Sequence, residues 1–230
     1  MDSLKKGKCV IINMETFDPS QKLDNRKGTD KDANSLKEVF ESLGFTVQIK
    51  KNATHQEIVE VLNEAAQPDA SQWSCFVFVV LSHGEEGRFH CFDDIVEVEN
   101  LFSKFRECKG LVGKPKLFFF QACRGEKRDC GVTTYSTAVK KNEYKIPVEA
   151  DFLCHYSTPL GYVAYRNPEK GSCFIQTLCE MLKKYSKKYE LLQILTRVNH
   201  SVAFHYVASI EHQWKEMPCF VSTLTKDLYL

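Results

Sequence analysis

Apolar residues along the chain form short unbroken runs that alternate with stripes at helical spacing. The runs predict six strands, at residues 8–13, 45–49, 75–82, 116–121, 151–156 and 218–224. The stripes predict five helices, at residues 30–43, 54–67, 101–105, 172–185 and 191–202. Alternating strands and helices are typical of a mostly parallel sheet with helices on both faces, so we expect an α/β fold.

Local signals at the helix ends support this division. Thr54 followed by Glu57 forms a capping-box pattern at the start of the second helix, and Ser172 can cap the fourth. Gly44 directly follows the first helical stripe, where a glycine commonly ends a helix. Residues 87–97 predict a small hairpin outside the main sheet.

Two of the predicted strands lead to residues with reactive side chains. The run at 116–121 leads directly to Cys123, and the run at 75–82 leads to His83. In open α/β sheets the ligand crevice lies outside the carboxyl ends of the strands, where both side chains are expected. Cys123 alone has a plainer interpretation as a buried structural cysteine, because free cysteines are among the most buried residues.

Chain length and net charge limit the number of domains and the kinds of partner that we expect. The 230 residues are within the range of a single α/β domain. A net charge of +1 provides no long-range field for nucleic acid or an anionic membrane, so we expect neither as a partner. No apolar run reaches the ~18 residues of a membrane span, and the polar first residues do not form a signal peptide. We therefore expect a cytoplasmic protein.

The ten cysteines do not indicate a disulfide scaffold or a metal site. Several lie inside apolar runs, and no pair has the Cys-x-x-Cys spacing of zinc ligands. We expect nine of them to be reduced thiols, with Cys123 as the exception, and we expect neither a metal nor a cofactor.

The two strand-end motifs together resemble the caspase family of cysteine proteases. Residues 121–125 read Gln-Ala-Cys-Arg-Gly, which is a caspase signature, and residues 82–84 read Ser-His-Gly. Further matches follow in order along nearly the whole chain, at residues 26–30, 113–117, 146–152, 165–168, 194–199 and 218–226. The resemblance implies a caspase-like six-stranded, mostly parallel sheet flanked by about five helices.

The resemblance also implies one catalytic domain over residues 1–230, made as a zymogen. It consists of a large-subunit segment (1–131), an intersubunit linker (132–147) and a small-subunit segment (148–230). The family usually cuts this linker after an aspartate, but this chain has Tyr135 at the usual site and no aspartate between Asp129 and Asp151. We therefore predict that the chain does not process itself there.

By the same resemblance, Cys123 is the nucleophile and His83 transfers the protons. Backbone N–H groups of Gly84 and Cys123 would bind the oxyanion. A thiolate attacks peptide carbonyls well near neutral pH, and an imidazole can protonate the leaving amine. The resemblance gives five substrate-binding residues: Arg26, Gln121, Arg166, Tyr165 and Asn167.

The specificity expected from the resemblance is for aspartate at P1, the residue before the scissile bond. Two guanidiniums can hold one carboxylate by charge-assisted hydrogen bonds. Arg26 or Arg166 alone would be read as an ordinary surface arginine, and their occurrence with both motifs is what favours a pocket. Val163, Tyr165 and Cys173 differ from the residues usual in executioner caspases, so the outer subsites are expected to differ as well.

Three functions follow from these observations. The first is a cysteine endopeptidase that cleaves proteins after aspartate in apoptosis, and that works as a homodimer with a caspase inhibitor or an activating protease as further partners. The second is a non-catalytic homologue that binds and regulates active caspases. The third, a related peptidase that cuts after lysine or arginine, would need an acidic pocket, which Arg26 and Arg166 oppose.

Overall fold

The computed structural model describes residues 5–67, 71–106, 108–125, 149–207 and 214–230. Its centre is a six-stranded sheet in the order β2-β1-β3-β7-β8-β9. The strands are β1 (Lys5–Asn13), β2 (Phe45–Lys51), β3 (Trp73–Leu81), β7 (Lys116–Gln121), β8 (Phe152–Tyr156) and β9 (Cys219–Ser222). All neighbouring pairs are parallel except β8 and β9, so the carboxyl ends of five strands lie at one edge.

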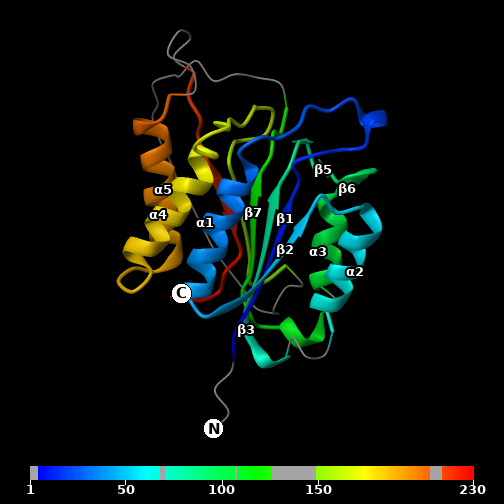
Figure 1. The fold of residues 1–230 in the computed structure, drawn as a ribbon. Coiled ribbons are helices and arrows are strands. Elements are labelled where there is room, and N and C mark those ends of the chain that lie inside the picture. Colours follow the sequence, from blue (N-terminus) through cyan, green and yellow to red (C-terminus); the bar gives the residue numbers. More distant parts are fainter. Residues whose placement is uncertain (1–4, 68–70, 107, 126–148, 208–213) are drawn as a thin grey trace.

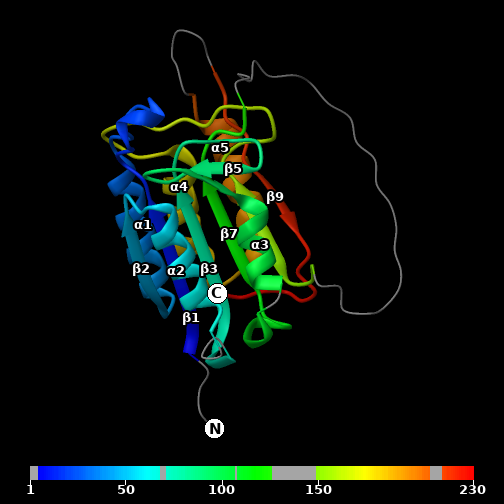
Figure 2. The same ribbon diagram turned by 90° about the vertical axis from the view of Figure 1, so that its right-hand side faces the viewer.

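Helices cover both faces of this sheet, as the alternating pattern predicts. Figure 1 shows α1, α4 and α5 on one side of the sheet and α2 and α3 on the other, and Figure 2 shows the sheet from a second direction. The helices are α1 (Thr29–Ser42), α2 (His55–Ala65), α3 (Val98–Arg106), α4 (Cys173–Tyr185) and α5 (Leu191–His205). Single turns of 3-10 helix also occur, among them Pro19–Gln21 and Lys109–Leu111.

The apolar runs are unbroken because helices cover both faces of the sheet. Side chains of β3 alternate between the two cores, with Val77 and Val79 under α1, α4 and α5, and with Phe76 and Phe78 under α2 and α3. A strand buried on both faces has no solvent side on which polar residues would be favourable. The central strands are therefore apolar at nearly every position.

The capping signals read from the sequence are confirmed, whereas some helix bounds differ: α3 begins at Val98 rather than 101, and α5 continues to His205. The Thr54 side chain accepts from the backbone N–H of Glu57 while the Glu57 carboxylate accepts from that of Thr54, which completes the capping box. The Ser172 hydroxyl accepts from the N–H of Ile175 at the start of α4. Gly44, with φ of 88°, occupies the left-handed position after α1, where a side chain would be strained.

The hairpin predicted within residues 87–97 is part of a second, three-stranded sheet. It consists of β4 (Gly84–Glu85), β5 (Arg88–His90) and β6 (Ile95–Glu97), and both neighbouring pairs are antiparallel. This small sheet begins directly after His83, so its hydrogen bonds fix the chain that leaves the end of β3.

The predicted fold class is confirmed, with differences in element length. β1 begins three residues earlier than the apolar run, and β2 extends two residues further, because polar residues can still pair at the ends of a ladder. The predicted linker at 132–147, with Tyr135, lies outside the described residues. None of the helices that the structure describes is both long enough and apolar enough to cross a membrane.

Candidate active site

The loops that follow the parallel strands meet around one cavity at the carboxyl edge of the sheet. Cys123 lies two residues beyond the end of β7, and His83 lies two residues beyond the end of β3. The cavity has a volume of about 290 Å³. Nine residues line it: Arg26, Ser82, His83, Gln121, Ala122, Cys123, Ala164, Tyr165 and Arg166. Six of the eight residues predicted for the site are in this lining, whereas Gly84 and Asn167 lie outside it.

The Cys123 thiol lies against the backbone of an extended segment, residues 163–166, from the C-terminal part of the chain. The backbone N–H of Ala164 donates to Cys123 Sγ across 3.4 Å, and the thiol faces the carbonyl oxygen of the same residue at 3.8 Å. Cys123 itself is only partly buried. The thiol is therefore accessible from the cavity and has a backbone edge beside it.

The His83 ring is oriented by a backbone carbonyl. Its Nε2 lies 2.8 Å from the carbonyl oxygen of Asp24. Because a carbonyl oxygen can only accept, Nε2 carries the proton and Nδ1 is the basic nitrogen of the neutral ring. Burial lowers the pKa of His83, the Asp24 carbonyl raises it, and the charges of Arg26 and Arg166 lower it further. The net effect favours a neutral ring near pH 7, which is able to accept a proton.

Gly84 is required by close packing rather than by its own backbone angle. A β-carbon on this residue would lie 2.9 Å from the Arg88 carbonyl oxygen, 3.0 Å from the Ala122 side chain and 3.1 Å from the Cys123 carbonyl oxygen. Only glycine allows the chain after His83 to approach the chain around Cys123 this closely. This contact brings the backbone of the two strand ends together.

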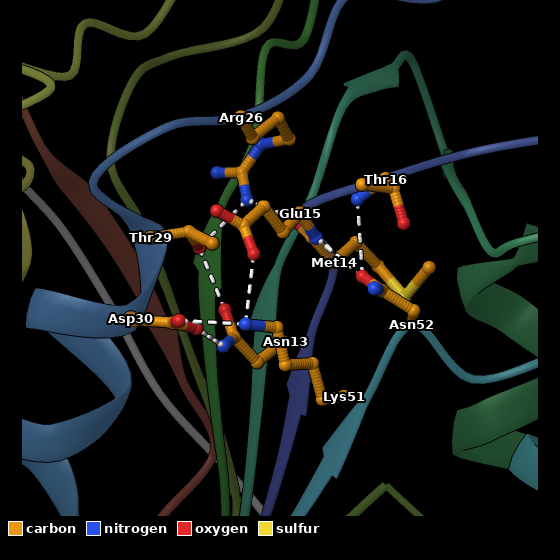
Figure 3. Close-up of polar contacts among 9 residues, drawn as sticks. All are labelled: Asn13, Met14, Glu15, Thr16, Arg26, Thr29, Asp30, Lys51 and Asn52. Atoms are coloured by element: carbon orange, nitrogen blue, oxygen red, sulfur yellow. Dashed lines mark hydrogen bonds and ion pairs between the residues drawn. The ribbon is translucent and has the colours of Figure 1, made fainter.

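Arg26 enters the cavity from a buried position on the loop between β1 and α1. The residue is 1% exposed, and its Nη1 donates to the Met14 carbonyl at 2.7 Å and to the Thr29 hydroxyl at 2.9 Å. Figure 3 shows these contacts beside the end of β1. A buried guanidinium with two fixed acceptors has little rotational freedom, so its remaining N–H groups are held in place before any ligand arrives.

A chain of polar contacts connects this arginine to the ends of β1 and β2 (Figure 3). The Thr29 hydroxyl donates to Asn13 at 2.7 Å, and the Asn13 amide donates to Asp30 at 2.7 Å. Lys51 then bridges Asp30 at 2.6 Å and Glu15 at 2.7 Å. These contacts attach the loop that carries Arg26 to the rigid sheet.

Arg166 reaches the same cavity from the extended segment that passes Cys123. Its Nε donates to the carbonyl oxygen of Lys27 at 2.9 Å, next to Arg26 in the chain. Burial and the charge of Arg166 lower the pKa of Arg26 to about 9, so both guanidiniums are charged at neutral pH. Burial likewise lowers the pKa of Arg166. None of the described residues that line this cavity is acidic, and the buried Gln121 Oε1 has no hydrogen-bond partner among the described residues.

Asp32 attaches the turn after Arg166 to the helix after Arg26. Its fully buried carboxylate accepts from the Ser172 N–H at 3.0 Å and from the Gln176 amide at 2.7 Å. A β-carbon on Gly171 would lie 2.3 Å from the Asp32 carboxylate, so glycine is needed for this close approach. Two arginines from distant parts of the sequence are thereby held at one cavity.

Asn167 fixes a turn of the chain and lines a neighbouring cavity. Its side-chain oxygen accepts from the backbone N–H groups of Glu169 and Lys170, at 2.8 and 3.0 Å, which fixes the turn that follows Arg166. The neighbouring cavity has a volume of about 840 Å³ and is also lined by Cys173 and Tyr206. Asn167 is therefore placed beside the lining of the first cavity rather than within it.

Backbone groups and one buried acid contribute to the site without a signal in the sequence. The Asp24 carbonyl and the Ala164 backbone act through main-chain atoms, for which side-chain patterns give no signal. Glu216 is 1% exposed and accepts from the Tyr165 N–H at 2.8 Å. It lies in a polar stretch without periodicity, so nothing in the sequence distinguishes it from a surface glutamate.

Known proteins are similar to this chain in sequence and in fold. A family model described as "Caspase domain" matches residues 6–229. The chain is 48% identical to caspase-3 of Mesocricetus auratus and 43% identical to caspase-7 of Gallus gallus, with 100% of this chain aligned to 85% and 78% of those proteins. A crystal structure of caspase-1 from Spodoptera frugiperda superposes with a TM-score of 0.90 at 37% identity, and covers 99% of this chain and 92% of that one.

Proposed function

The chain belongs to the caspase family of aspartate-specific cysteine proteases that act in apoptosis, and from this premise we propose how its own residues carry out the reaction. It is a cysteine peptidase, and the comparisons do not favour a non-catalytic homologue. We assign Cys123 as the nucleophile and His83 as the residue that transfers protons. The observation that supports this most is that both lie in one cavity with Arg26 and Arg166.

Acylation begins when the neutral His83 ring takes the proton of the Cys123 thiol, and the resulting thiolate attacks the carbonyl carbon of the scissile peptide. The negative charge moves to the carbonyl oxygen, where the N–H groups of Gly84 and Cys123 are the proposed donors, each contributing about 3 kcal/mol. The protonated His83 ring then gives its proton to the leaving amine, which departs as the C–N bond breaks. A thioester with Cys123 remains.

Deacylation uses the same residues in reverse. The neutral His83 ring takes a proton from a water molecule, whose oxygen attacks the thioester carbon. The C–S bond breaks, the acid product leaves, and Cys123 is regenerated as thiolate beside protonated His83. The carbonyl of Asp24, 2.8 Å from Nε2, keeps the ring in one orientation through both halves of the reaction.

Recognition of P1 aspartate follows from the two guanidiniums and the Gln121 amide. The substrate carboxylate would replace water on Arg26 and Arg166, which face the cavity without an acidic residue in its described lining. An uncharged residue of the same size would leave both cations desolvated and unpaired. This is the reason why we propose aspartate rather than a basic residue, which the positive lining repels.

The direct test is cleavage of a fluorogenic peptide with aspartate at P1. We expect wild-type protein to turn the peptide over and Cys123→Ala to show no cleavage above background, because the variant lacks the nucleophile but loses little volume. A thermal melt within a few degrees of wild type would show that the fold is kept. Cys91→Ala, at a buried cysteine away from the cavity, is the matched control. Equal activity of wild type and Cys123→Ala would refute the assignment.

We further propose a cytoplasmic zymogen that functions as a homodimer. The exposed edge strand β9 supports the dimer, since within the described part of the chain it pairs only with β8, and it presents Val221 with 65% of its surface exposed. The absence of aspartate between Asp129 and Asp151 predicts that the chain does not cut its own linker, which stays uncut or is opened by another protease at Lys140, Lys141 or Glu143. Intact-mass analysis of the purified protein after long incubation would check it. Fragments separated within residues 132–147 would contradict this prediction.

A further inference from the structure

We propose that Glu216 is a positioning residue for the substrate-binding segment, because its buried carboxyl group holds the backbone N–H of Tyr165. This inference rests on the proposed function, since the segment matters only if substrate binds beside Cys123. It concerns a residue that neither sequence motif contains. The segment in question consists of residues 163–166, and we call it the binding segment.

The binding segment has two edges with different partners. On one edge, the Ala164 N–H and carbonyl face Cys123 Sγ, at 3.4 and 3.8 Å. On the other edge, the Tyr165 N–H donates to Glu216 Oε2 at 2.8 Å. Backbone groups of successive residues in an extended chain point to opposite sides, so Arg166 faces the same side as Ala164. Glu216 therefore fixes the back of a segment whose front faces the thiol and the cavity.

The chain that carries Glu216 is itself attached on both sides of this residue. The Lys215 ammonium donates to the Tyr206 carbonyl at 2.6 Å, just past the end of α5. The Trp214 ring stacks on the Tyr165 ring, with centroids 6.1 Å apart and an interplanar angle of 21°. Beyond Pro218 the chain enters β9. Glu216 thus connects the binding segment to α5 and to the sheet.

The surroundings of Glu216 favour its neutral form. It is 1% exposed, and its Oε1 has no partner among the described residues. The charged or titratable groups that face it are Asp32 from α1, Tyr206 after α5 and Cys173 at the start of α4, while Lys215 is engaged with a carbonyl. None of these four supplies a paired positive charge. Burial raises the pKa of Glu216 to about 8, the Tyr165 N–H lowers it, and Asp32 raises it further.

Ionisation of Glu216 would place an unpaired charge in this buried position. Keeping a carboxylate away from water without a paired cation costs free energy, so residues 214–217 would move to let water reach it. The hydrogen bond to Tyr165 would then be lost and the binding segment released. We therefore expect substrate binding to weaken as pH rises through about 8, in addition to any effect of the catalytic pair.

The test compares three variants by KM and kcat for an aspartate peptide between pH 6.5 and 9.5. Glu216→Gln keeps an acceptor of the same size and cannot ionise, so we expect wild-type KM at pH 7 and a KM that no longer rises above pH 8. Glu216→Ala leaves the Tyr165 N–H without its acceptor, and its KM should be about tenfold higher at pH 7 with kcat changed less. Glu190→Gln, at another buried glutamate that caps α5, is the matched control and should match wild type throughout.

Alkylation of Cys123 by iodoacetamide distinguishes a failure of the proposed function from a failure of the positioning role. If wild type is alkylated but cleaves no aspartate peptide, the proposed function fails, whatever Glu216 does. If wild type cleaves and Glu216→Gln shows the same rise in KM above pH 8, the positioning role is wrong. If Glu216→Ala keeps wild-type KM at pH 7, the role is equally wrong. A Glu216→Ala protein that does not fold leaves the Glu216→Gln comparison as the decisive result.

Discussion

The guanidinium of Arg166 is held by fewer contacts than that of Arg26, although both face one cavity. Arg26 is 1% exposed and has two fixed acceptors, whereas Arg166 donates its Nε to the Lys27 carbonyl from a partly exposed position. Replacement of Arg26 would leave buried acceptors unpaired and disturb the loop. Arg166 is therefore the better residue for testing the pocket without damaging the fold.

We predict that Arg166→Ala keeps the reactivity of Cys123 and loses cleavage of aspartate peptides by about a hundredfold or more, because one partner of a buried charge pair is missing. Iodoacetamide labelling and kcat/KM on the same preparation measure the two effects. Arg197→Ala, at an arginine outside the cavity that stacks on the partly buried Tyr189 ring, is the control. A parallel loss of labelling would mean that the substitution disturbs the nucleophile rather than the pocket.

At the level of single residues, sequence identified side chains that form local motifs. Cys123 and His83 could be found because each ends an apolar run and carries a recognisable neighbour pattern. Glu216 and the Asp24 carbonyl could not be found, because their roles depend on which distant backbone atoms lie beside them. Such contacts arise only when the whole chain has folded.

The strand β8 contains a polar residue at a position where its neighbours are apolar. His155 is fully buried among Phe119, Phe174 and Phe220, and its Nε2 bonds to Asn199 of α5 at 2.9 Å. Burial lowers the pKa of His155 to about 4, although the bond to Asn199 opposes this shift. The folded strand therefore carries a neutral histidine, and protonation would disrupt its packing.

This burial predicts an acid-sensitive fold. An unfolded chain protonates its histidine near pH 6.5, so stability is complete above that pH and is lost as pH falls toward 4, by up to about 3 kcal/mol. Urea unfolding at pH 7, 6 and 5 measures the loss. His155→Phe should show a shallower decline, whereas His205→Gln, at an exposed position on α5, should follow wild type. Identical slopes for all three proteins would show that His155 does not contribute.

At the level of elements, the sequence predicted which segments form helices and strands better than where they end. The capping box at Thr54 and the cap at Ser172 worked because they are local hydrogen bonds between neighbours. β1 extends to Lys5 through pairing with β3, where Lys5 lies opposite Trp73, and this pairing depends on the tertiary fold. Its residues carry no apolar signal of their own.

The six-stranded sheet has two edge strands, β2 and β9, and among the described residues β9 has no partner strand on its outer side. Phe220 packs inward against His155, while the adjacent Val221 is 65% exposed. An antiparallel edge strand can pair with the same strand of a second copy about a two-fold axis, which would continue the sheet. This is the structural reason for the proposed homodimer.

We predict that Val221→Lys shifts the protein toward monomer, because a charged side chain would oppose its own copy across the axis. Sedimentation equilibrium at micromolar concentration measures the mass. Val112→Lys, at a valine that is 64% exposed and lies away from β9, should keep the wild-type mass. A wild-type protein that remains at 26.5 kDa over the whole concentration range would contradict the proposal.

Distant parts of the chain meet at one cavity, which we expect to select a single carboxylate. The most direct measurement is kcat/KM of wild-type protein for two peptides that differ only in aspartate or asparagine at P1. Two guanidiniums facing an uncharged amide would remain desolvated and unpaired, so we expect the aspartate peptide to be favoured by roughly 10⁴. If the asparagine peptide is cleaved within tenfold of the aspartate peptide, the two guanidiniums do not select the carboxylate.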